Sequence, residues 1–382
     1  MNAPFLDEPS VMRHALEIAR RGIGRVEPNP PVGAVIVDEQ LNLLGAGAHL
    51  EFGGPHAEVY ALRTAGEKSR GATMFVTLEP CCHQGKTPPC SRAIIEAGIK
   101  RVVVALRDPA PHVDGGGIAA LREAGVVVET GSLAEAAVLL AAPFLKRVTT
   151  GRPFVHAKWA MTLDGKIASR EGHSKWISNE TARLKVHELR GRMDAIVVGS
   201  ETARRDDPLL TARPAGPRVA TRIVIDRDLK LDPKSRLFHT IGQAPVLIAT
   251  SEAAERERGK LYRGLGAEVL AVPWSNSAER RLDLGMLLLE LGQREMSNVL
   301  IEGGGGILGD LFDRQEIDAC HVFIAPKLVG GQTAPGPLAG KGLDAIPEGQ
   351  QFRVQQFELL EDNACFYGVI DSPWLKKLID RR

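Results

Sequence analysis

The sequence predicts an α/β protein of two domains, each built on a mostly parallel sheet covered by helices. The length of 382 residues fits two domains, at about 100–200 residues per domain. Strand-like apolar runs alternate with helix-like segments along the whole chain, which is typical of layered α/β folds. A turn-rich junction, Thr149-Thr150-Gly151-Arg152-Pro153, separates the halves. We therefore place the domains at residues 1–148 and 152–382.

The first half begins with a helix, because Ser10 stands where an N-cap is expected and apolar residues with helical spacing follow it. Short runs rich in Val, Ile and Phe predict strands at 32–37, 73–78, 102–106 and 126–129. Segments with helical periodicity between them predict helices at 58–65, 91–97 and 121–124. An apolar helix that ends near Lys146 closes the half.

The second half opens with a predicted strand at 154–161. Further strands, most of them separated by helical segments, are predicted at 195–199, 222–226, 246–250, 268–272, 299–302 and 321–325. Two strand-like stretches, 351–360 and 364–370, flank Glu361-Asp362-Asn363. This pattern predicts a hairpin, which would add an antiparallel edge to the sheet.

Composition and charge disfavour several classes of protein. Apolar residues make up 44% and charged residues 25%, which is ordinary for a globular chain. The first 150 residues hold 15 Lys and Arg against 16 Asp and Glu, and the rest hold 33 against 31, so neither half has the basic excess of a nucleic-acid binder. The longest apolar stretch, 136–145, is too short to span a membrane. Five cysteines, three of them crowded together, suit a reducing cytoplasm.

A cluster of metal-ligating residue types lies in the first half. His-Ala-Glu begins at His56, Glu-Pro-Cys-Cys-His begins at Glu79, and Cys90 follows. A zinc deaminase needs three protein ligands, an open position for a water whose pKa the metal lowers, and a carboxylate that moves protons. His-x-Glu opening one helix and Pro-Cys…Cys at the start of another supply these parts.

Other interpretations of the cluster remain open. A structural zinc site would be closed by a fourth ligand, with Cys82 or His83 available. Alternatively, Cys81 and Cys90 are small buried apolar residues. For function, a nucleic-acid base deaminase and a zinc-stabilised binding module compete with a small-molecule enzyme. The balanced charge and the aromatic content of 5% favour the enzyme over the nucleic-acid deaminase.

The spacing of the motifs resembles one family. Eight residues separate Cys81 from Cys90, whereas Pro-Cys-x-x-Cys is usual. Pro-Asn-Pro-Pro-Val-Gly from Pro28, Gly-Ala-Gly-Ala-His from Gly45 and Gly-Lys-Thr-Pro-Pro-Cys up to Cys90 occur in the order seen in the bifunctional deaminase–reductases of riboflavin biosynthesis. In the second half, 158–168, 194–199 and 206–213 resemble the reductase part of that family.

For the first half, the resemblance implies a cytidine-deaminase-like α/β/α domain that binds one zinc ion. Glu58 is implied to be the catalytic proton shuttle. The implied zinc ligands are His56, Cys81 and Cys90. The implied contacts to the pyrimidine and its phosphoribosyl group are Asn29, His49 and Lys86. The ammonium group of Lys86 suits a substrate phosphate.

For the second half, the resemblance implies a dihydrofolate-reductase-like α/β domain that uses NADPH. The implied cofactor contacts are Ala160, Trp176, Thr202, Asp206, Arg227, Gly304, Gly305 and Gly306. The implied substrate contacts are Lys158, Ser174, Arg190, Leu210, Arg213 and Glu302. A glycine run before a helix lets a phosphate approach backbone N–H groups, although a flexible connection would look the same. Arg190 and Arg213 suit a substrate phosphate, and Arg227 suits the 2′-phosphate of NADPH.

The resemblance as a whole implies a zinc-dependent hydrolase joined to an NADPH-dependent oxidoreductase. The first activity would convert 2,5-diamino-6-(5-phosphoribosylamino)pyrimidin-4(3H)-one into 5-amino-6-(5-phosphoribosylamino)uracil, and the second would reduce the ribosyl chain to a ribityl chain. We expect small phosphoribosyl pyrimidines as partners, without nucleic acid or membrane, in the cytoplasm. The sequence leaves a homo-oligomer open.

Overall fold

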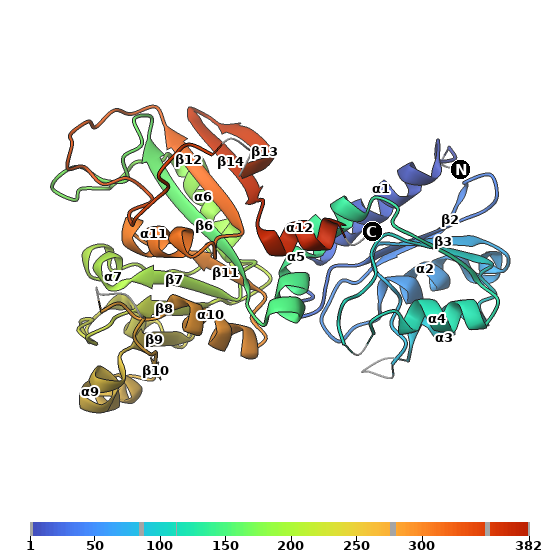
Figure 1. Ribbon diagram of the computed structural model, residues 1–382, viewed down its shortest axis with the longest axis horizontal. Helices are drawn as coiled ribbons and strands as arrows, with labels where there is room; N and C mark the ends of the chain where they lie inside the picture. Colours follow the sequence, from blue (N-terminus) through green and yellow to red (C-terminus); the bar gives the residue numbers. More distant parts are fainter. Residues whose placement is uncertain (1–2, 84–87, 112, 276–279, 348–351, 381–382) are drawn as a thin grey trace. The chain divides into compact units, whose positions relative to one another are not determined.

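The computed structural model divides into two compact units (Figure 1). It describes residues 3–83, 88–111, 113–275, 280–347 and 352–380. The units are Met1–Gly151 with Pro373–Arg382, and Arg152–Ser372. The last helix, α12 (Pro373–Asp380), is absent from the sequence-based prediction and packs against α5 (Ala134–Thr150). It therefore groups with the first unit, whereas the predicted boundary at 152–382 places it with the second.

The first unit is built on a five-stranded sheet. Its strands are β1 (Gly33–Val37), β2 (Leu43–Ala48), β3 (Thr73–Val76), β4 (Arg101–Val104) and β5 (Val127–Thr130), in the order β2-β1-β3-β4-β5. β3, β4 and β5 are parallel, and β1 is antiparallel to both β2 and β3. The sequence pattern missed β2, because Leu-Leu-Gly-Ala-Gly-Ala lacks the branched and aromatic residues that mark a strand.

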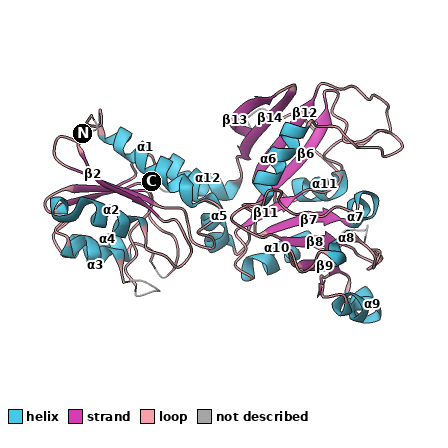
Figure 2. Cartoon of the chain, turned by 180° about the vertical axis from the view of Figure 1, so that it is seen from behind, coloured by secondary structure: helices cyan, strands magenta, loops and turns pink. Residues whose placement is uncertain are grey.

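Helices cover both faces of this sheet (Figure 2). Successive strand side chains point to opposite faces. Ala34 and Ile36 pack against α2 (Ala57–Ala65), α3 (Cys90–Glu96) and α4 (Gly116–Glu123). Val35 and Val37 pack on the side of α1 (Glu8–Ala19) and α5. The result is the three-layer α/β/α arrangement. Short 3-10 helices follow α1 and α2, at Arg20–Gly22 and Gly66–Ser69.

The predicted cap of the first helix is wrong by one turn. Asp7 is the N-cap of α1, and its carboxylate accepts a hydrogen bond from the Ser10 N–H at 2.7 Å. Glu8 and a proline occupy the first helical positions, where an acidic residue and proline are both favourable. The helix therefore begins before Ser10, which lies inside its first turn.

The second unit contains a nine-stranded sheet. Its strands are β6 (Phe154–Thr162), β7 (Ala195–Gly199), β8 (Thr221–Ile225), β9 (Val246–Thr250), β10 (Glu268–Ala271), β11 (Asn298–Ile301), β12 (Ala319–Ala325), β13 (Phe352–Leu360) and β14 (Asn363–Ile370). The spatial order is β10-β9-β8-β7-β11-β6-β12-β14-β13. Strands β6 to β12 run parallel. The predicted C-terminal hairpin is confirmed, because β13 and β14 pair antiparallel at the edge.

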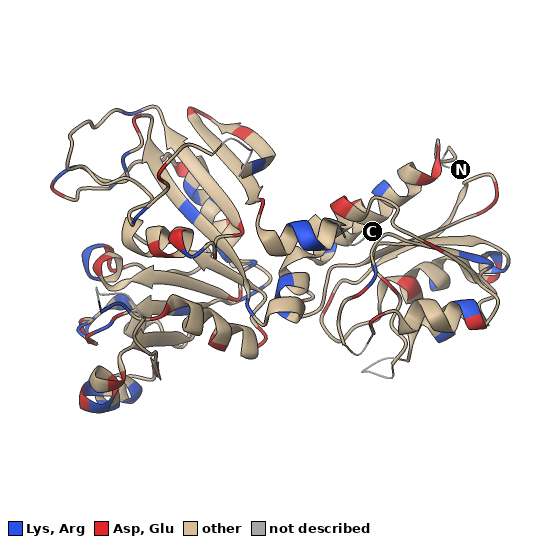
Figure 3. Cartoon of the chain, viewed as in Figure 1, with Lys and Arg blue, Asp and Glu red and all other residues tan. Residues whose placement is uncertain are grey.

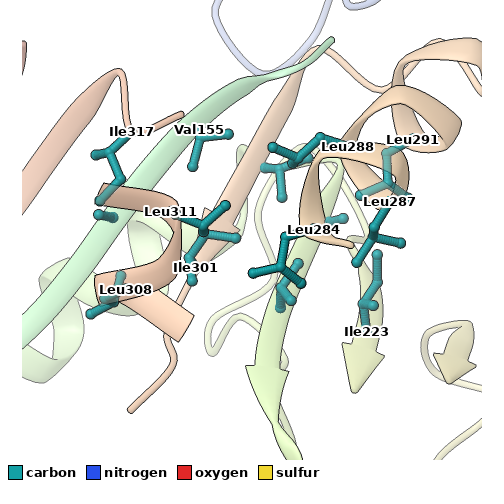
Figure 4. Packing of buried hydrophobic residues seen from close by; sticks show 14 of the residues in the cluster. Val155, Ile223, Leu284, Leu287, Leu288, Leu291, Ile301, Leu308, Leu311 and Ile317 are labelled. Atoms are coloured by element: carbon teal, nitrogen blue, oxygen red, sulfur yellow. The ribbon is translucent and has the colours of Figure 1, made fainter. Parts of the chain in front are cut away.

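Two apolar cores lie on the two faces of this sheet. In one of them, Val155, Ile223 and Ile301 pack against α10 (Leu284–Gln293) and α11 (Gly305–Asp313) (Figure 4). The opposite core involves α7 (Ser200–Asp206), α8 (Arg236–His239) and α9 (Glu252–Gly264). A smaller cluster joins α6 (Glu180–Arg190) to β12 and β14.

Charges of both signs are mixed along the exposed elements. Figure 3 shows Lys and Arg interleaved with Asp and Glu, most densely on α9. On α9, the exposed pair Arg256 and Glu252 lies 3.3 Å apart at helical spacing. Within the part of the chain that the structure describes, no helix combines the length and apolar character needed to cross a membrane.

One buried arginine ties several loops to the second sheet. Arg222, in β8, is 0% exposed and donates five hydrogen bonds to neutral oxygens. The acceptors are the carbonyl groups of Leu209, Leu237, Thr240 and Ala244 and the hydroxyl group of Thr240. Burial lowers the pKa of the Arg222 guanidinium to about 10. These hydrogen bonds connect β8 to the loop that carries Leu210, because the carbonyl group of Leu209 is one of the acceptors.

We predict that Arg222→Leu lowers the free energy of unfolding of the second unit by about 3 kcal/mol or more. The leucine leaves several buried carbonyl groups without a donor, and each such group costs about 1–3 kcal/mol. Urea unfolding monitored by circular dichroism measures the change. Arg256→Leu, which removes an exposed ion pair, is the control and is expected to cost less than about 1 kcal/mol. Equal small losses in both variants would contradict the role of Arg222.

Candidate active sites

The starts of two helices bring the candidate zinc ligands together. His56 is the N-cap of α2, Cys90 is the first residue of α3, and Cys81 lies in the loop that follows β3. The His56 Nδ1 atom lies 3.6 Å from the Cys81 Sγ and 3.3 Å from the Cys90 Sγ. Tetrahedral zinc holds nitrogen and sulfur ligands about 3.6 Å apart. The three side chains therefore fit a zinc ion.

The electrostatics of the cluster also suit a cation. A hydrogen bond from Cys90 lowers the pKa of the Cys81 thiol to about 4, and the same contact raises the pKa of Cys90. The hydrogen bond with Cys81 raises the pKa of His56. Helix N-termini favour thiolates in addition. These shifts favour the thiolate form of Cys81, and metal binding must displace the protons that its ligands carry.

Among the residues that the structure describes, the cluster has no fourth protein ligand. Among the described residues, the grouped ligand atoms are those of His56, Cys81 and Cys90, which lie within 4.8 Å of one another. A Cβ atom built on Gly116 would lie 2.8 Å from the Cys82 Sγ, so this thiol faces the start of α4. Three ligands favour an open, catalytic zinc site over a closed structural one.

Glu58 lies beside the ligands in the first turn of α2. Its side chain is 3% exposed, and its Oε2 atom has no hydrogen-bond partner among the described residues. Burial raises the pKa of the Glu58 carboxyl to about 7, against the opposing charge of His56. A group that titrates near neutral pH can both accept and return a proton. Glu58 thus has the surroundings expected of a proton shuttle.

Asn29 and His49 border the same cluster. The Asn29 Nδ2 atom lies 3.4 Å from the His49 Nε2 atom, and the His49 ring packs edge-on against His56 with 5.2 Å between centroids. The His49 Nδ1 atom lies 3.1 Å from the carbonyl oxygen of Pro55, so Nδ1 donates and Nε2 is the acceptor. Burial lowers the pKa of His49. Lys86, the third predicted substrate contact, lies outside the described residues.

The second unit contains a cavity of about 860 Å³ beside the carboxyl ends of β6, β7 and β11. The strand order reverses here, at the kind of switch point where open α/β sheets bind ligands. All the predicted reductase residues except Arg227 line it. They are Lys158, Ala160, Ser174, Trp176, Arg190, Thr202, Asp206, Leu210, Arg213, Glu302, Gly304, Gly305 and Gly306.

A buried charge cluster forms the base of this cavity. Nε and Nη2 of Arg190 donate to the two carboxylate oxygens of Glu302 at 2.6 and 2.9 Å, and the Lys158 Nζ atom lies 3.9 Å from Glu302. Burial would raise the pKa of Glu302, but the charge of Arg190 and its hydrogen bonds lower it to about 2. Burial lowers the pKa of Lys158. Glu302 therefore occupies two donors of Arg190, which also lines the cavity.

Arg213 holds a more exposed guanidinium at the same cavity. Its Nη1 atom donates to the Thr211 hydroxyl at 2.8 Å, and its Nη2 atom lies 3.5 Å from the His187 Nε2 atom. His187 also lines the cavity and was missed in the sequence. Its position three residues before Arg190 was a usable signal, because residues with that spacing share a face of a helix, as both do on α6.

The glycines in the run at 303–306 have different surroundings. A Cβ atom on Gly305 would lie 2.8 Å from the carbonyl oxygen of Gly336, so Gly305 packs against a neighbouring loop. A Cβ atom on Gly306 would meet nothing within 4 Å. Gly306 lines the large cavity and also a second cavity of about 340 Å³. It therefore stands where the two cavities adjoin.

Arg227 lies in the second cavity, apart from the other predicted cofactor contacts. Its half-exposed side chain pairs with Asp228 at 3.0 Å, which raises the pKa of Arg227. The neighbouring Asp226 is 2% exposed, and its carboxylate accepts hydrogen bonds from the backbone N–H groups of Lys230 and Leu231. Asp226 is thus engaged by the backbone, and Arg227 is the more accessible residue.

Known proteins match both units. Residues 7–106 match the family model of the cytidine and deoxycytidylate deaminase zinc-binding region, and residues 153–365 match that of the RibD C-terminal domain. The riboflavin biosynthesis protein RibD of Actinobacillus pleuropneumoniae is 39% identical over 362 residues, or 95% of each chain. The Escherichia coli K12 protein of that name is 37% identical over 94% of this chain and 98% of its own.

Solved structures also match this chain over most of its length. Acinetobacter baumannii RibD matches with a TM-score of 0.80 and 33% identity, over 95% of this chain and 99% of that chain. The Thermotoga maritima diaminohydroxyphosphoribosylaminopyrimidine deaminase/5-amino-6-(5-phosphoribosylamino)uracil reductase matches with a TM-score of 0.80 and 38% identity, over 95% and 98% of the two chains.

Fold and site together define a cytidine-deaminase-like, zinc-binding domain joined to a dihydrofolate-reductase-like reductase domain. The predicted fold class is confirmed. The chain belongs to the RibD family, the bifunctional deaminase–reductases of riboflavin biosynthesis. It is an enzyme with hydrolase and oxidoreductase activities, and its cofactors are zinc and NADPH.

We predict one zinc ion per purified chain, bound through His56, Cys81 and Cys90. Cys81→Ser and Cys90→Ser should each lose the metal, because serine is a poor zinc ligand at neutral pH. Elemental analysis of dialysed protein measures the content. Cys82→Ser is the matched control and should keep the full complement, since its thiol faces α4. Loss of zinc from Cys82→Ser alone would show that the ligand set is wrong.

Proposed function

We propose that the first unit deaminates 2,5-diamino-6-(5-phosphoribosylamino)pyrimidin-4(3H)-one to 5-amino-6-(5-phosphoribosylamino)uracil. The observation that carries the proposal is the buried Oε2 atom of Glu58, which lies beside a three-ligand cluster and has no hydrogen-bond partner among the described residues. The name of the Thermotoga maritima relative supports the identity of the substrate. When bound, zinc supplies a water of lowered pKa.

In this mechanism, Glu58 passes one proton of the attacking water to the ring nitrogen. It then carries the proton of the newly added hydroxyl group to the amine, which departs as ammonia. Burial raises the pKa of its carboxyl group to about 7, which suits a group that exchanges protons. Asn29 and His49 offer an amide and an imidazole at the border of the cluster, where they can orient the pyrimidine by hydrogen bonds. Lys86 is proposed to pair with the substrate phosphate on grounds of charge alone.

We propose that the second unit reduces the ribosyl chain of the uracil product to a ribityl chain. NADPH supplies the hydride for C1′. Gly306 lines two cavities, and the backbone N–H groups at the start of α11 would hold the phosphates of the dinucleotide. Arg227, which lines the smaller cavity, would hold the 2′-phosphate. We propose Lys158, whose Nζ atom lies 3.9 Å from Glu302, as the group that handles the accompanying proton.

Several aspects of the setting are proposals as well. Mixed surface charge favours small phosphoribosyl pyrimidines over nucleic acid or a membrane surface. The five cysteines are free thiols, which suits the reducing cytoplasm. A homo-oligomer is compatible with these features.

We predict that Glu58→Gln separates the two activities. The amide cannot accept the proton, so deamination should fall by about 10²–10⁴-fold or more. Reduction of chemically supplied uracil product with NADPH should stay near the wild-type rate, because Glu58 belongs to the first unit. Product formation is followed by chromatography, and NADPH consumption by absorbance. Loss of both activities in a folded, zinc-containing variant would contradict the assignment of separate sites.

We predict that two arginine substitutions in the second unit weaken the binding of different molecules. Arg213→Ala should raise the KM for the uracil substrate by roughly tenfold to a hundredfold, because a charge-assisted hydrogen bond contributes about 1.5–3 kcal/mol. Arg227→Ala should instead raise the KM for NADPH and narrow the preference over NADH. Steady-state kinetics with each substrate varied measures both effects. A weaker NADPH affinity in Arg213→Ala, or equal use of NADH by the wild type, would overturn the assignment.

A further inference from the structure

Glu79 stands two residues before the ligand Cys81, yet its carboxylate is bound by backbone groups from another part of the chain. The side chain is 4% exposed. Its Oε1 atom accepts hydrogen bonds from the N–H groups of Gly117 and Ile118 at 3.0 and 3.1 Å. Its Oε2 atom accepts from Asp108 and Gly115, both at 3.2 Å.

These contacts fasten the start of α4 to the segment that carries the zinc ligand. The first N–H groups of a helix have no partner within the helix, and negative charge is favourable there. The N-cap residue of α4 is a glycine, which has no side chain to accept them. Glu79 fills this role from a loop about 40 residues earlier in the chain.

The first turn of α4 also lies directly against Pro80–Cys82, the segment that carries the ligand Cys81 and is called the ligand loop below. A Cβ atom on Gly117 would lie 1.9 Å from the Pro80 carbonyl oxygen, and one on Gly116 would lie 2.8 Å from the Cys82 Sγ. On its other side, Cys81 accepts hydrogen bonds from the start of α3. The Ser91 N–H donates to the Cys81 carbonyl at 3.1 Å, and the Cys90 N–H donates to its Sγ at 3.3 Å.

We propose that Glu79 is a positioning residue for the zinc site. Its carboxylate holds the first turn of α4 against the Pro80–Cys82 backbone, and this fixes the direction of the Cys81 Sγ toward His56. The inference rests on the proposed ligand set. A cap that served only the stability of α4 would leave the metal unaffected, whereas a positioning residue changes how tightly and in what geometry the metal is held.

Glu79→Gln tests the proposal with little change of shape. The amide replaces one acceptor by a donor that faces the backbone N–H groups. We expect zinc affinity to weaken by about 10–100-fold, as is usual when a residue supporting a metal ligand is lost. Zinc transfer to a chromophoric chelator measures this in the full-length holoenzyme, and the visible spectrum of the cobalt-substituted protein reports ligand geometry. Deaminase kcat should fall, while the reductase rate is unchanged.

Asp194→Asn is the matched control. The Asp194 Oδ2 atom accepts two buried backbone hydrogen bonds, from Ser297 and Asn298 at 2.8 Å each, in the second unit. This variant should lose stability while keeping wild-type zinc transfer and the wild-type cobalt spectrum. The comparison separates a general loss of stability from a specific effect on the metal.

A second pair of variants tests the same contact without touching Glu79. In Gly116→Ala, the added methyl group would clash with the Cys82 Sγ, so zinc transfer should become faster. The double variant that also carries Cys82→Ala should transfer zinc at the wild-type rate. If Glu79→Gln does not fold, this pair decides the question, and an unchanged transfer rate in Gly116→Ala overturns the proposal.

A folded Glu79→Gln variant with wild-type zinc transfer and cobalt spectrum would also overturn the proposal. Failure of the proposed function looks different. If Cys81→Ser kept its zinc, the ligand set itself would be wrong, whereas failure of the positioning role alone leaves the loss of zinc from Cys81→Ser intact.

Discussion

The direction of the strands determines where both active sites lie. In the first unit, β2, β3, β4 and β5 all point the same way, because β1 is antiparallel to its two neighbours. Their carboxyl ends share one edge, which places His49 after β2, Cys81 after β3 and Asp108 after β4. β1 begins at the same edge, shortly after Asn29 along the chain. In the second unit, the parallel strands gather the cavity residues in the same way.

The two sites treat a buried glutamate in opposite ways, as their chemistry requires. Burial dominates at Glu58 and raises the pKa of its carboxyl to about 7, so the group can exchange protons near neutral pH. At Glu302, the charges of Arg190 and Lys158 overcome burial and lower the pKa to about 2. The ionised form of that carboxylate is therefore favoured beside Arg190 and Lys158.

The parts that were predictable from sequence depend on residues close together along the chain. The ligand set and Glu58 lie in short motifs, and the parallel strands are runs of branched residues. Two missed elements differ in this respect. Strand β2 is rich in glycine and alanine and lacks a local signal. Helix α12 had a usable local signal that was not recognised, because it starts with a proline and its apolar residues have helical spacing. Nothing local to Arg190 indicates that Glu302, 112 residues away, occupies its guanidinium.

Two glycine-rich helix starts show that a glycine run in the sequence can be interpreted only with the structure. Gly115-Gly116-Gly117 and Gly303-Gly304-Gly305-Gly306 both precede or open a helix, so either could bind a phosphate. At α4, the carboxylate of Glu79 already accepts the N–H groups, and the glycines permit close packing against the ligand loop. At α11, no side chain of the described residues caps the helix, and a Cβ atom on Gly306 would stand in open space beside two cavities. The same residue type therefore permits close packing in one unit and leaves open space in the other.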